Sequence, residues 1–267
     1  MKIGRIVCAG RAPKTTEQAR KVLLEGLFKL PHERIIITPG GFSRLKLESS
    51  LPFPRGWGTG WPAFRMLSER AIWFVRRNVF RGGEHLTAHK TVTVCVDVYD
   101  PRGKVAELVV VRQDYGEVTW HVTGKSFPRT DEEKELYLAP PHTHIVMVQG
   151  WKVLVLGCHD LNAWSRRSIA NAKTRARTDK RRELVNWVDT IQPSIVLHHP
   201  HATDSHKTWL PGWSGIKKSL NIRHHASAIG YYNEYGRFVE GFREPLDKVL
   251  ATYRSENVKD IVFTGFE

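Results

Sequence analysis

The sequence predicts an α/β fold with a mixed β-sheet, and three observations support this. Short apolar runs rich in Val and Ile, typical of buried strands, recur along the whole chain of 267 residues. Segments with apolar residues at helical spacing separate many of these runs. No repeat, low-complexity tract or linker rich in Ser, Gly and Pro divides the sequence. We therefore expect a single domain that spans residues 1–267.

The first part of the chain alternates strand and helix. IGRIVCAG (3–10) predicts a strand, and residues 16–29 predict a helix that a threonine at its start could cap. RIIIT (34–38) is a compact apolar run that ends at Pro-Gly-Gly, as expected of a buried strand. Residues 43–62 are rich in Pro, Gly and Trp and predict a long irregular loop.

The middle of the chain is dominated by strands. Apolar and charged residues alternate at helical spacing over residues 62–79, which predicts a helix with Pro62 in its first turn. TVTVCVDVYD, GKVAELVVVRQ and EVTWHVTG follow, separated by PRG and DYG, and predict a three-stranded meander. HIVMVQG and WKVLVLG predict a further strand pair with a turn at Gln149-Gly150.

The last third again mixes both kinds of element. We first expect a basic helix, a strand over 191–197 and a helix over 212–220. One strand in HHASAIGYY and a turn at 233–236 follow. A helix over 245–254 and a final strand in DIVFT end the series.

The formal net charge of +14 attracts polyanions, so a nucleic-acid partner has to be considered. The basic residues are dispersed except in Arg166–Arg182, which has the composition of a cationic helix. That segment is either a solvated helix face or a surface for nucleic acid or an acidic partner, and no RNP, zinc-finger or KH-type signature accompanies it. No apolar run is long enough to span a membrane, and the N-terminal apolar stretch is too short for a signal peptide. We therefore expect a cytoplasmic protein that does not contact membranes.

The three cysteines are too few and too widely spaced for a disulfide framework. Cys8 and Cys95 lie within apolar, β-branched runs and are expected to be inert core residues. Cys158 is different, because it follows the apolar run KVLVLG and precedes His159 and Asp160. The carboxyl ends of strands are where α/β folds hold their sites, and a thiolate placed there can act as a nucleophile.

The strand–Cys–x–Asp element resembles the nucleophile motif of the nitrilase (carbon–nitrogen hydrolase) superfamily. Upstream, GEVTWHVTGKSF places Lys125 where that family has its catalytic lysine, and DEEKELYLAP matches the acidic stretch that follows it. Downstream, PSIVLHHPHATDSHKTW is similar to the segment that follows the nucleophile. The resemblance covers residues 1–240 in order, and its strength lies in this ordered spacing, since each motif alone is common.

The resemblance implies a four-layer αββα sandwich, often dimeric, and a thiol hydrolase that cleaves a C–N bond in a small amide, nitrile or carbamoyl compound. Cys158 would form the covalent intermediate and Lys125 would stabilise the developing charge. The resemblance implies neither a cofactor nor a metal. His159, Asp160, His199 and His201 are expected around the pocket, with Asp160 mainly in a structural role.

One position departs from the family pattern. The general-base glutamate of the family normally follows a proline at the end of the second strand, and the matching position in IIITPGGF is Gly40. Without that base, general acid–base assistance of about 10²–10⁴-fold would be missing. Either another carboxylate substitutes, or the protein is not a standard amidase. The candidates are Glu48, Glu132, Glu133 and Glu135, of which we favour Glu135.

Two other interpretations remain open. The protein could be an inactive relative that binds nucleic acid or an acidic partner through Arg166–Arg182. Alternatively, the His-rich loop LHHPHATDSH could hold the metal of a phosphoesterase, since His and Asp are suitable ligands. The first strand, however, ends in CAGRAP and lacks the acidic residue that such folds require. Cys158 and Lys125 could also be a packed thiol and an ordinary surface lysine.

Overall fold

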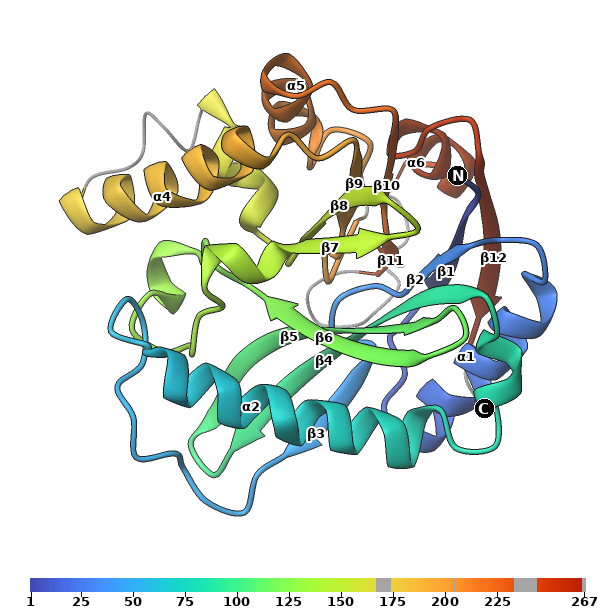
Figure 1. Cartoon of the computed structure of the whole chain (residues 1–267), viewed down its shortest axis with the longest axis horizontal. Coiled ribbons are helices and arrows are strands. Elements are labelled where there is room, and N and C mark those ends of the chain that lie inside the picture. The colour runs from blue at the N-terminus through green and yellow to red at the C-terminus, as the bar shows by residue number, and fades with distance from the viewer. Residues whose placement is uncertain (167–173, 204, 233–243, 266–267) are drawn as a thin grey trace.

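Two β-sheets pack face to face, and helices cover the outer face of each (Figure 1). The structure is a computed structural model that describes residues 1–166, 174–203, 205–232 and 244–265. In Figure 1 the layers follow one another from α4 and α5, through the two sheets, to α1 and α2. The expected αββα sandwich with mixed sheets is confirmed.

The larger sheet has the strand order β11-β1-β2-β4-β5-β6, with β12 paired to β1 and β3 paired to β4. Its strands are β1 (Ile3–Ala9), β2 (Ile35–Ile37), β3 (Ser43–Lys46), β4 (Lys90–Asp100), β5 (Gly103–Asp114), β6 (Val118–Gly124), β11 (Ile229–Tyr231) and β12 (Val258–Thr264). The predicted strands at both ends of the chain and the β4–β5–β6 meander are confirmed. Strand β3 was not predicted. Its sequence SRLK contains a single large apolar residue, so it carries no strand pattern.

The smaller sheet has the order β10-β9-β8-β7, with β7 (Ile145–Val148), β8 (Trp151–Leu156), β9 (Ile195–His198) and β10 (His224–Ser227). The predicted hairpin of β7 and β8 is confirmed. The single strand expected in HHASAIGYY is wrong, because the segment forms two strands in different sheets. Strand β10 pairs with β9, whereas β11 pairs with β1. The chain therefore passes from one sheet to the other at Ala228, which lies between these strands.

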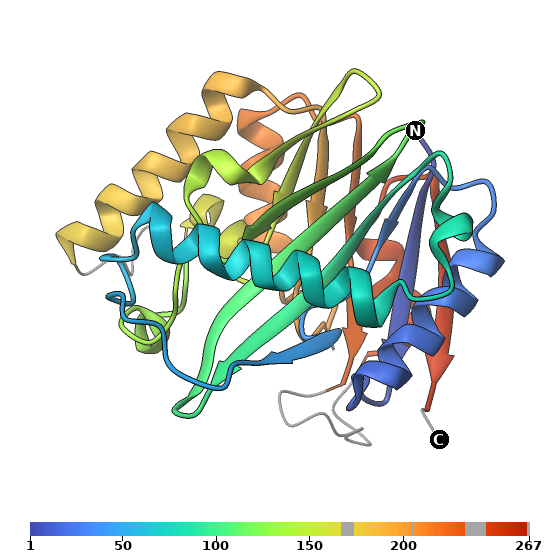
Figure 2. The ribbon, with the colours of Figure 1, turned by 60° about the horizontal axis from the view of Figure 1, so that its bottom comes forward.

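Helices cover the outer faces of the sheets (Figure 2). The basic helix runs to Ile191, beyond its expected end at Arg182, and the strand expected over 191–197 begins only at Ile195. Helices α1 (Thr16–Lys29) and α2 (Trp61–Phe74), the latter continued by a π-helix over Val75–Val79, cover the larger sheet. Helices α4 (Arg175–Ile191) and α5 (Leu210–Ser219) cover the smaller sheet. The described residues further contain helix α6 (Leu246–Thr252) and short 3₁₀ helices over Glu84–Thr87, Thr130–Glu132, Pro141–His144 and Asp160–Trp164. At the start of α1, the Thr15 side chain accepts a hydrogen bond from the Gln18 backbone, as the sequence predicted.

The core agrees with the sequence interpretation of the cysteines. Cys8 and Cys95 are buried within the apolar cluster of the larger sheet, and burial raises the pKa of both thiols. The described residues contain no helix with the length and apolar composition needed to cross a bilayer.

The basic segment Arg166–Arg182 is described only in part, since residues 167–173 lie outside the described residues, as does the turn expected at 233–236. In the described part, Arg175 pairs with Asp179 and Lys180 with Glu183. Arg177 is nearly buried and pairs with Glu133. Much of the positive charge of α4 is therefore compensated within the protein. Nucleic-acid or acidic-partner binding at this segment stays a prediction.

Candidate active site

A row of charged residues crosses the larger sheet on the side that faces the smaller sheet. Asp97 of β4 lies opposite Glu107 of β5 in the antiparallel register, and Arg44 of β3 lies opposite Asp97 on its other side. Lys125 extends the row, because its backbone N–H donates to the Glu107 carbonyl at 2.9 Å just after β6 ends. Directly opposite residues on paired strands project to the same face. Residues from four parts of the sequence therefore meet at one place.

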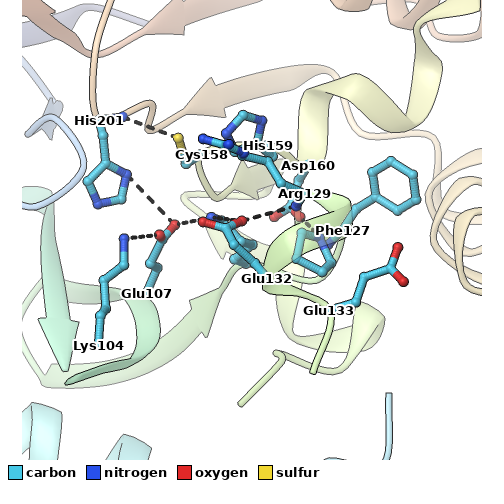
Figure 3. A network of polar contacts seen from close by, with 12 residues as sticks. Lys104, Glu107, Phe127, Arg129, Glu132, Glu133, Cys158, His159, Asp160 and His201 are labelled. Atoms are coloured by element: carbon cyan, nitrogen blue, oxygen red, sulfur yellow. Dashed lines mark hydrogen bonds and ion pairs between the residues drawn. The ribbon is translucent and has the colours of Figure 1, made fainter. Parts of the chain in front are cut away.

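The smaller sheet supplies the thiol and an imidazole. Cys158 follows β8 after Gly157, and His201 lies in the loop that follows β9. A Cβ atom at position 157 would lie 2.9 Å from the Lys125 backbone nitrogen, so only glycine allows the end of β8 to approach Lys125 this closely. The His201 backbone N–H donates to Cys158 Sγ at 3.4 Å (Figure 3). Donor atoms of Cys158, His201 and Glu107 all lie within 4.8 Å of one another.

Ion pairs hold the two carboxylates of the row in place. His201 Nε2 lies 2.8 Å from Asp97 Oδ1, which leaves Nδ1 on the side of Glu107 at 3.7 Å. Glu107 lies between two lysines, with Lys104 Nζ at 2.5 Å from Oε1 and Lys125 Nζ at 2.7 Å from Oε2. Figure 3 shows Glu107 between Lys104 and Glu132, below the thiol and the imidazole. Lys125 Nζ is also 2.9 Å from Glu132 Oε2.

The electrostatic environment favours a thiolate. Burial alone raises the pKa of Cys158, but the imidazoles of His159 and His201 and their hydrogen bonds outweigh burial and lower it from 9.0 to about 5. Burial alone lowers the pKa of His201, but Asp97, Glu107 and Cys158 raise it well above 6.5. The stable pair at neutral pH is therefore a thiolate next to an imidazolium.

The same charges keep Glu107 ionised. Burial favours its neutral form, but His201, Lys125 and Lys104 together hold its pKa well below 4.5. Lys125 is likewise buried, and Glu107, Cys158 and Glu132 raise its pKa above the usual range. The site is thus a compact set of alternating charges between the sheets.

Gly40 lies beside His201. A Cβ atom at position 40 would lie 2.7 Å from His201 Nδ1 and 2.8 Å from the His201 backbone nitrogen. The imidazole therefore occupies the space into which a glutamate at position 40 would project. The departure of this sequence from the family pattern has a structural counterpart, since a histidine from another loop fills the place of the glutamate.

Asp160 holds the backbone around the site. It is fully buried and accepts N–H groups from Gly157 at 2.8 Å, Ser126 at 2.8 Å and Phe127 at 2.6 Å. These bonds tie the loop that carries Cys158 to the loop that carries Lys125. The expected structural role of Asp160 agrees with this geometry.

A cavity of about 700 Å³ opens in front of the thiol, a volume typical of small-molecule sites. Its lining comprises Ala12, Gly41, Arg44, Asp97, Tyr99, Lys104, Glu107, Lys125, Arg129, Glu132, Cys158, His159, His201, Ala202, Thr208, Trp209 and Tyr232. Cys158 is only 6% exposed and lies at the cavity wall, so a small molecule could contact it from the cavity.

Of the residues that the sequence indicated, Cys158, Lys125, His159 and His201 come together at the cavity. The structure does not bring Glu135 there. Glu135 is exposed and absent from the lining, whereas Glu132 lies 2.9 Å from Lys125 Nζ. His199 is buried behind the cavity, where its Nδ1 contacts the Thr38 carbonyl at 2.8 Å and burial lowers its pKa to about 4.

Asp97 and Glu107 were missed. A signal for them exists in the sequence, since each is the one charged residue within an apolar run, VTVCVDV and VAELVVV. The turn at PRG alone would pair Asp97 with Ala106, because a β-bulge between Val98 and Tyr99 shifts the register by one residue. The sequence therefore marks both carboxylates but does not place them opposite each other.

The histidines do not converge as a metal site would require. His198 contacts Ser227 and the Cys158 carbonyl, His201 contacts Asp97, and His206 contacts Glu244. Within the described ranges, one group of three side chains has donor atoms close enough to hold a metal ion, namely Glu107, Cys158 and His201.

Comparison with solved structures agrees with this architecture. An amidase from Nesterenkonia sp. superposes with a TM-score of 0.52 and 14% identity, covering 89% of this chain and 78% of the amidase. A cysteine-to-serine mutant of the Nesterenkonia AN1 amidase from the nitrilase superfamily gives a TM-score of 0.51 and 14% identity, covering 86% and 77%. No family model and no curated protein matches the sequence. The likeness lies in the fold alone, and the chain has the fold of the nitrilase-superfamily amidases.

Proposed function

We propose that the protein is a thiol hydrolase that cleaves a C–N bond in a small amide, nitrile or carbamoyl compound through a covalent intermediate on Cys158. The observation that carries the proposal is the position of His201 beside the thiol: its backbone N–H donates to Cys158 Sγ at 3.4 Å, and a ring nitrogen lies within 4.8 Å of the sulfur. Asp97 holds the same ring at 2.8 Å. A thiol, an imidazole and an orienting carboxylate form the arrangement that activates a cysteine nucleophile. Here His201 takes the place of the missing glutamate.

For an amide substrate, the Cys158 thiolate attacks the carbonyl carbon, and a C–S bond forms as the carbonyl oxygen takes up negative charge. Lys125, buried at the cavity wall, supplies positive charge for this oxyanion. The C–N bond then breaks, and the His201 imidazolium transfers its proton to the leaving nitrogen. The products of this half-reaction are a thioester on Cys158, a free amine or ammonia, and a neutral His201.

Water completes the cycle. His201, now neutral, removes a proton from the water molecule as the oxygen attacks the thioester carbon. The C–S bond breaks, the carboxylic acid leaves, and the thiolate–imidazolium pair is restored. Asp97 keeps the ring oriented through both steps, because its bond to Nε2 leaves Nδ1 toward the cavity.

The structural neighbours support the same proposal. One of them is described as a glutamate-to-glutamine mutant of the Nesterenkonia AN1 amidase with acrylamide added at its active-site cysteine, at a TM-score of 0.51 and 14% identity. In the present chain, Cys158 is the one cysteine that lines the large cavity. The alternative of an inactive binding protein lacks a comparable supporting contact.

The test is hydrolysis of a panel of short amides, nitriles and carbamoyl compounds, followed by ammonia release and intact-protein mass. We expect turnover with the native protein and an acyl adduct on Cys158 when the reaction is quenched. Cys158→Ala should abolish both signals, whereas Cys8→Ala, which changes a thiol outside the site, should retain them. Full activity of Cys158→Ala would rule the proposal out.

A further inference from the structure

We infer that the substrate carries a negatively charged group, such as a carboxylate, a few bonds from the scissile C–N bond, and that Arg44 binds this group. The inference rests on the proposed function, since it names the substrate class of the same site. It follows from the balance of charges around the cavity and from the place of Arg44 in the charged row.

The carboxylates of the cavity already have partners. Asp97 is bound by His201, Glu107 by Lys104 and Lys125, and Glu132 by Lys125. Against these three carboxylates the lining has four permanently charged cations, Arg44, Lys104, Lys125 and Arg129. The thiolate and imidazolium cancel each other. The lining therefore has one positive charge in excess before a substrate enters.

Arg44 is the cation in this set for which the described residues provide no ion-pair partner. It lies directly opposite Asp97 on the neighbouring strand, yet it makes no ion pair with any residue that the structure describes, because Asp97 is engaged by His201. Arg44 is also exposed, so its guanidinium stays hydrated and available at the cavity mouth. A planar guanidinium is well suited to bind a carboxylate through two parallel hydrogen bonds.

The row also sets the distance between the two ends of the substrate. Arg44 and Glu107 are two strands apart, which corresponds to about 10 Å between their backbones at the usual strand spacing. Glu107 lies beside the thiol, within the same 4.8 Å group. A long arginine side chain covers part of this span. A substrate that reaches both groups is therefore short, and a cavity of about 700 Å³ accommodates it.

The inference can be tested without a known substrate, by alkylating Cys158 with two isosteric reagents. N-bromoacetylglycine carries a carboxylate a few bonds from the reactive carbon, and N-bromoacetylglycinamide has a neutral amide in its place. Peptide mass spectrometry gives the alkylation rate of Cys158 for each reagent, with buried Cys8 and Cys95 as internal references. The charge preference is the rate for the acid divided by the rate for the amide.

We expect Arg44→Gln to lower the charge preference about 5-fold, as loss of one nearby charge in partly screened surroundings predicts. Lys46→Gln is the matched control, because Lys46 is an exposed cation on the same strand that does not line the cavity. It should leave the preference unchanged. Added salt should slow the acid reagent and not the amide.

An equal preference in the native protein and Arg44→Gln would overturn the inference while leaving the proposed function intact, provided that the neutral reagent still alkylates Cys158. If neither reagent modifies Cys158 in the folded protein, the proposed function fails and the inference fails with it.

Discussion

His201 occupies the space that any side chain at Gly40 would need. The closest approach, 2.7 Å between a Cβ at position 40 and His201 Nδ1, is shorter than real Cβ contacts. The position of the family glutamate and the position of the imidazole are therefore mutually exclusive in this fold. In the function that we propose, the absent glutamate and the histidine in its place are one structural change, and the Cys158–His201–Asp97 arrangement takes over the part of the carboxylate base.

Gly40→Ala should displace the imidazole from the thiol. Because the His201 backbone is also within 2.8 Å of the added methyl group, the loop cannot relax by a rotation of the ring alone. We expect hydrolysis to fall at least about 10-fold, in line with loss of acid–base assistance. Gly58→Ala is the control, since its Cβ would meet only ordinary contacts at 3.5 Å and beyond. Equal activity of the two variants would contradict the steric argument.

The alkylation rate of Cys158 should depend on pH in a way that reports the thiolate. The thiolate is the charged form above the pKa, so a pKa lowered to about 5 predicts a rate that rises through pH 5 and is nearly level at neutral pH. His201→Gln removes one of the groups that lower this pKa, so the midpoint should move upward toward 9.0. The rate of iodoacetamide modification, followed by peptide mass, measures both midpoints. A native midpoint near 9.0 would show that the thiol is not activated.

Glu107→Gln should destabilise the fold as well as the site. The substitution leaves Lys104 and Lys125 without their shared carboxylate, and Lys125 is buried. Removing one partner of a buried ion pair costs about 3–5 kcal/mol. Urea denaturation should show this loss, whereas Glu135→Gln, at an exposed position, should change the free energy of unfolding by less than about 0.5 kcal/mol. A similar stability for both variants would count against the buried network.

Asp160→Asn should also lower the stability. The carboxylate accepts three backbone N–H groups, and an amide can present only one oxygen to them. Leaving a buried N–H group unsatisfied costs about 1–3 kcal/mol. Asp179→Asn, on the exposed face of α4, provides a comparison that should stay close to the native value. The free energy of unfolding, from the midpoint and slope of a urea titration, should fall for Asp160→Asn and stay near the native value for Asp179→Asn. Equal values for the two variants would contradict the role of Asp160.

The fold could be predicted from the sequence because most of its strands are apolar runs and residues typical of turns separate them. The β4–β5–β6 meander and the hairpin of β7 and β8 follow from alternation and turn residues alone. Strand β3 could not be predicted, because its residues are mostly polar and its pairing with β4 is a contact between distant parts of the sequence. The split of HHASAIGYY escaped prediction for a similar reason, since strand pattern does not say which sheet a segment joins.

The sequence indicated those site residues that come directly after a strand and belong to a recognisable motif. Cys158 and Lys125 lie at strand ends with a recognisable spacing. The group that we propose in place of the glutamate could not be found in the same way, because it is neither a carboxylate near position 40 nor one that follows Lys125. Instead, His201 and Asp97 come from different sheets, and only the packing of the two sheets brings them to 2.8 Å.

The passage of the chain between sheets at Ala228 has a mechanical consequence. The Ala228 N–H donates to the His198 carbonyl, and the Thr203 N–H donates to the Gly230 carbonyl, so the crossing is fastened to both ends of the loop that carries His201. One continuous stretch of backbone thus connects the two sheets beside the Cys158 thiol. A shift of one sheet against the other at this point has to break these two hydrogen bonds. The position of the His201 backbone beside Cys158 is therefore fixed by hydrogen bonds of the main chain and does not depend on a bound molecule.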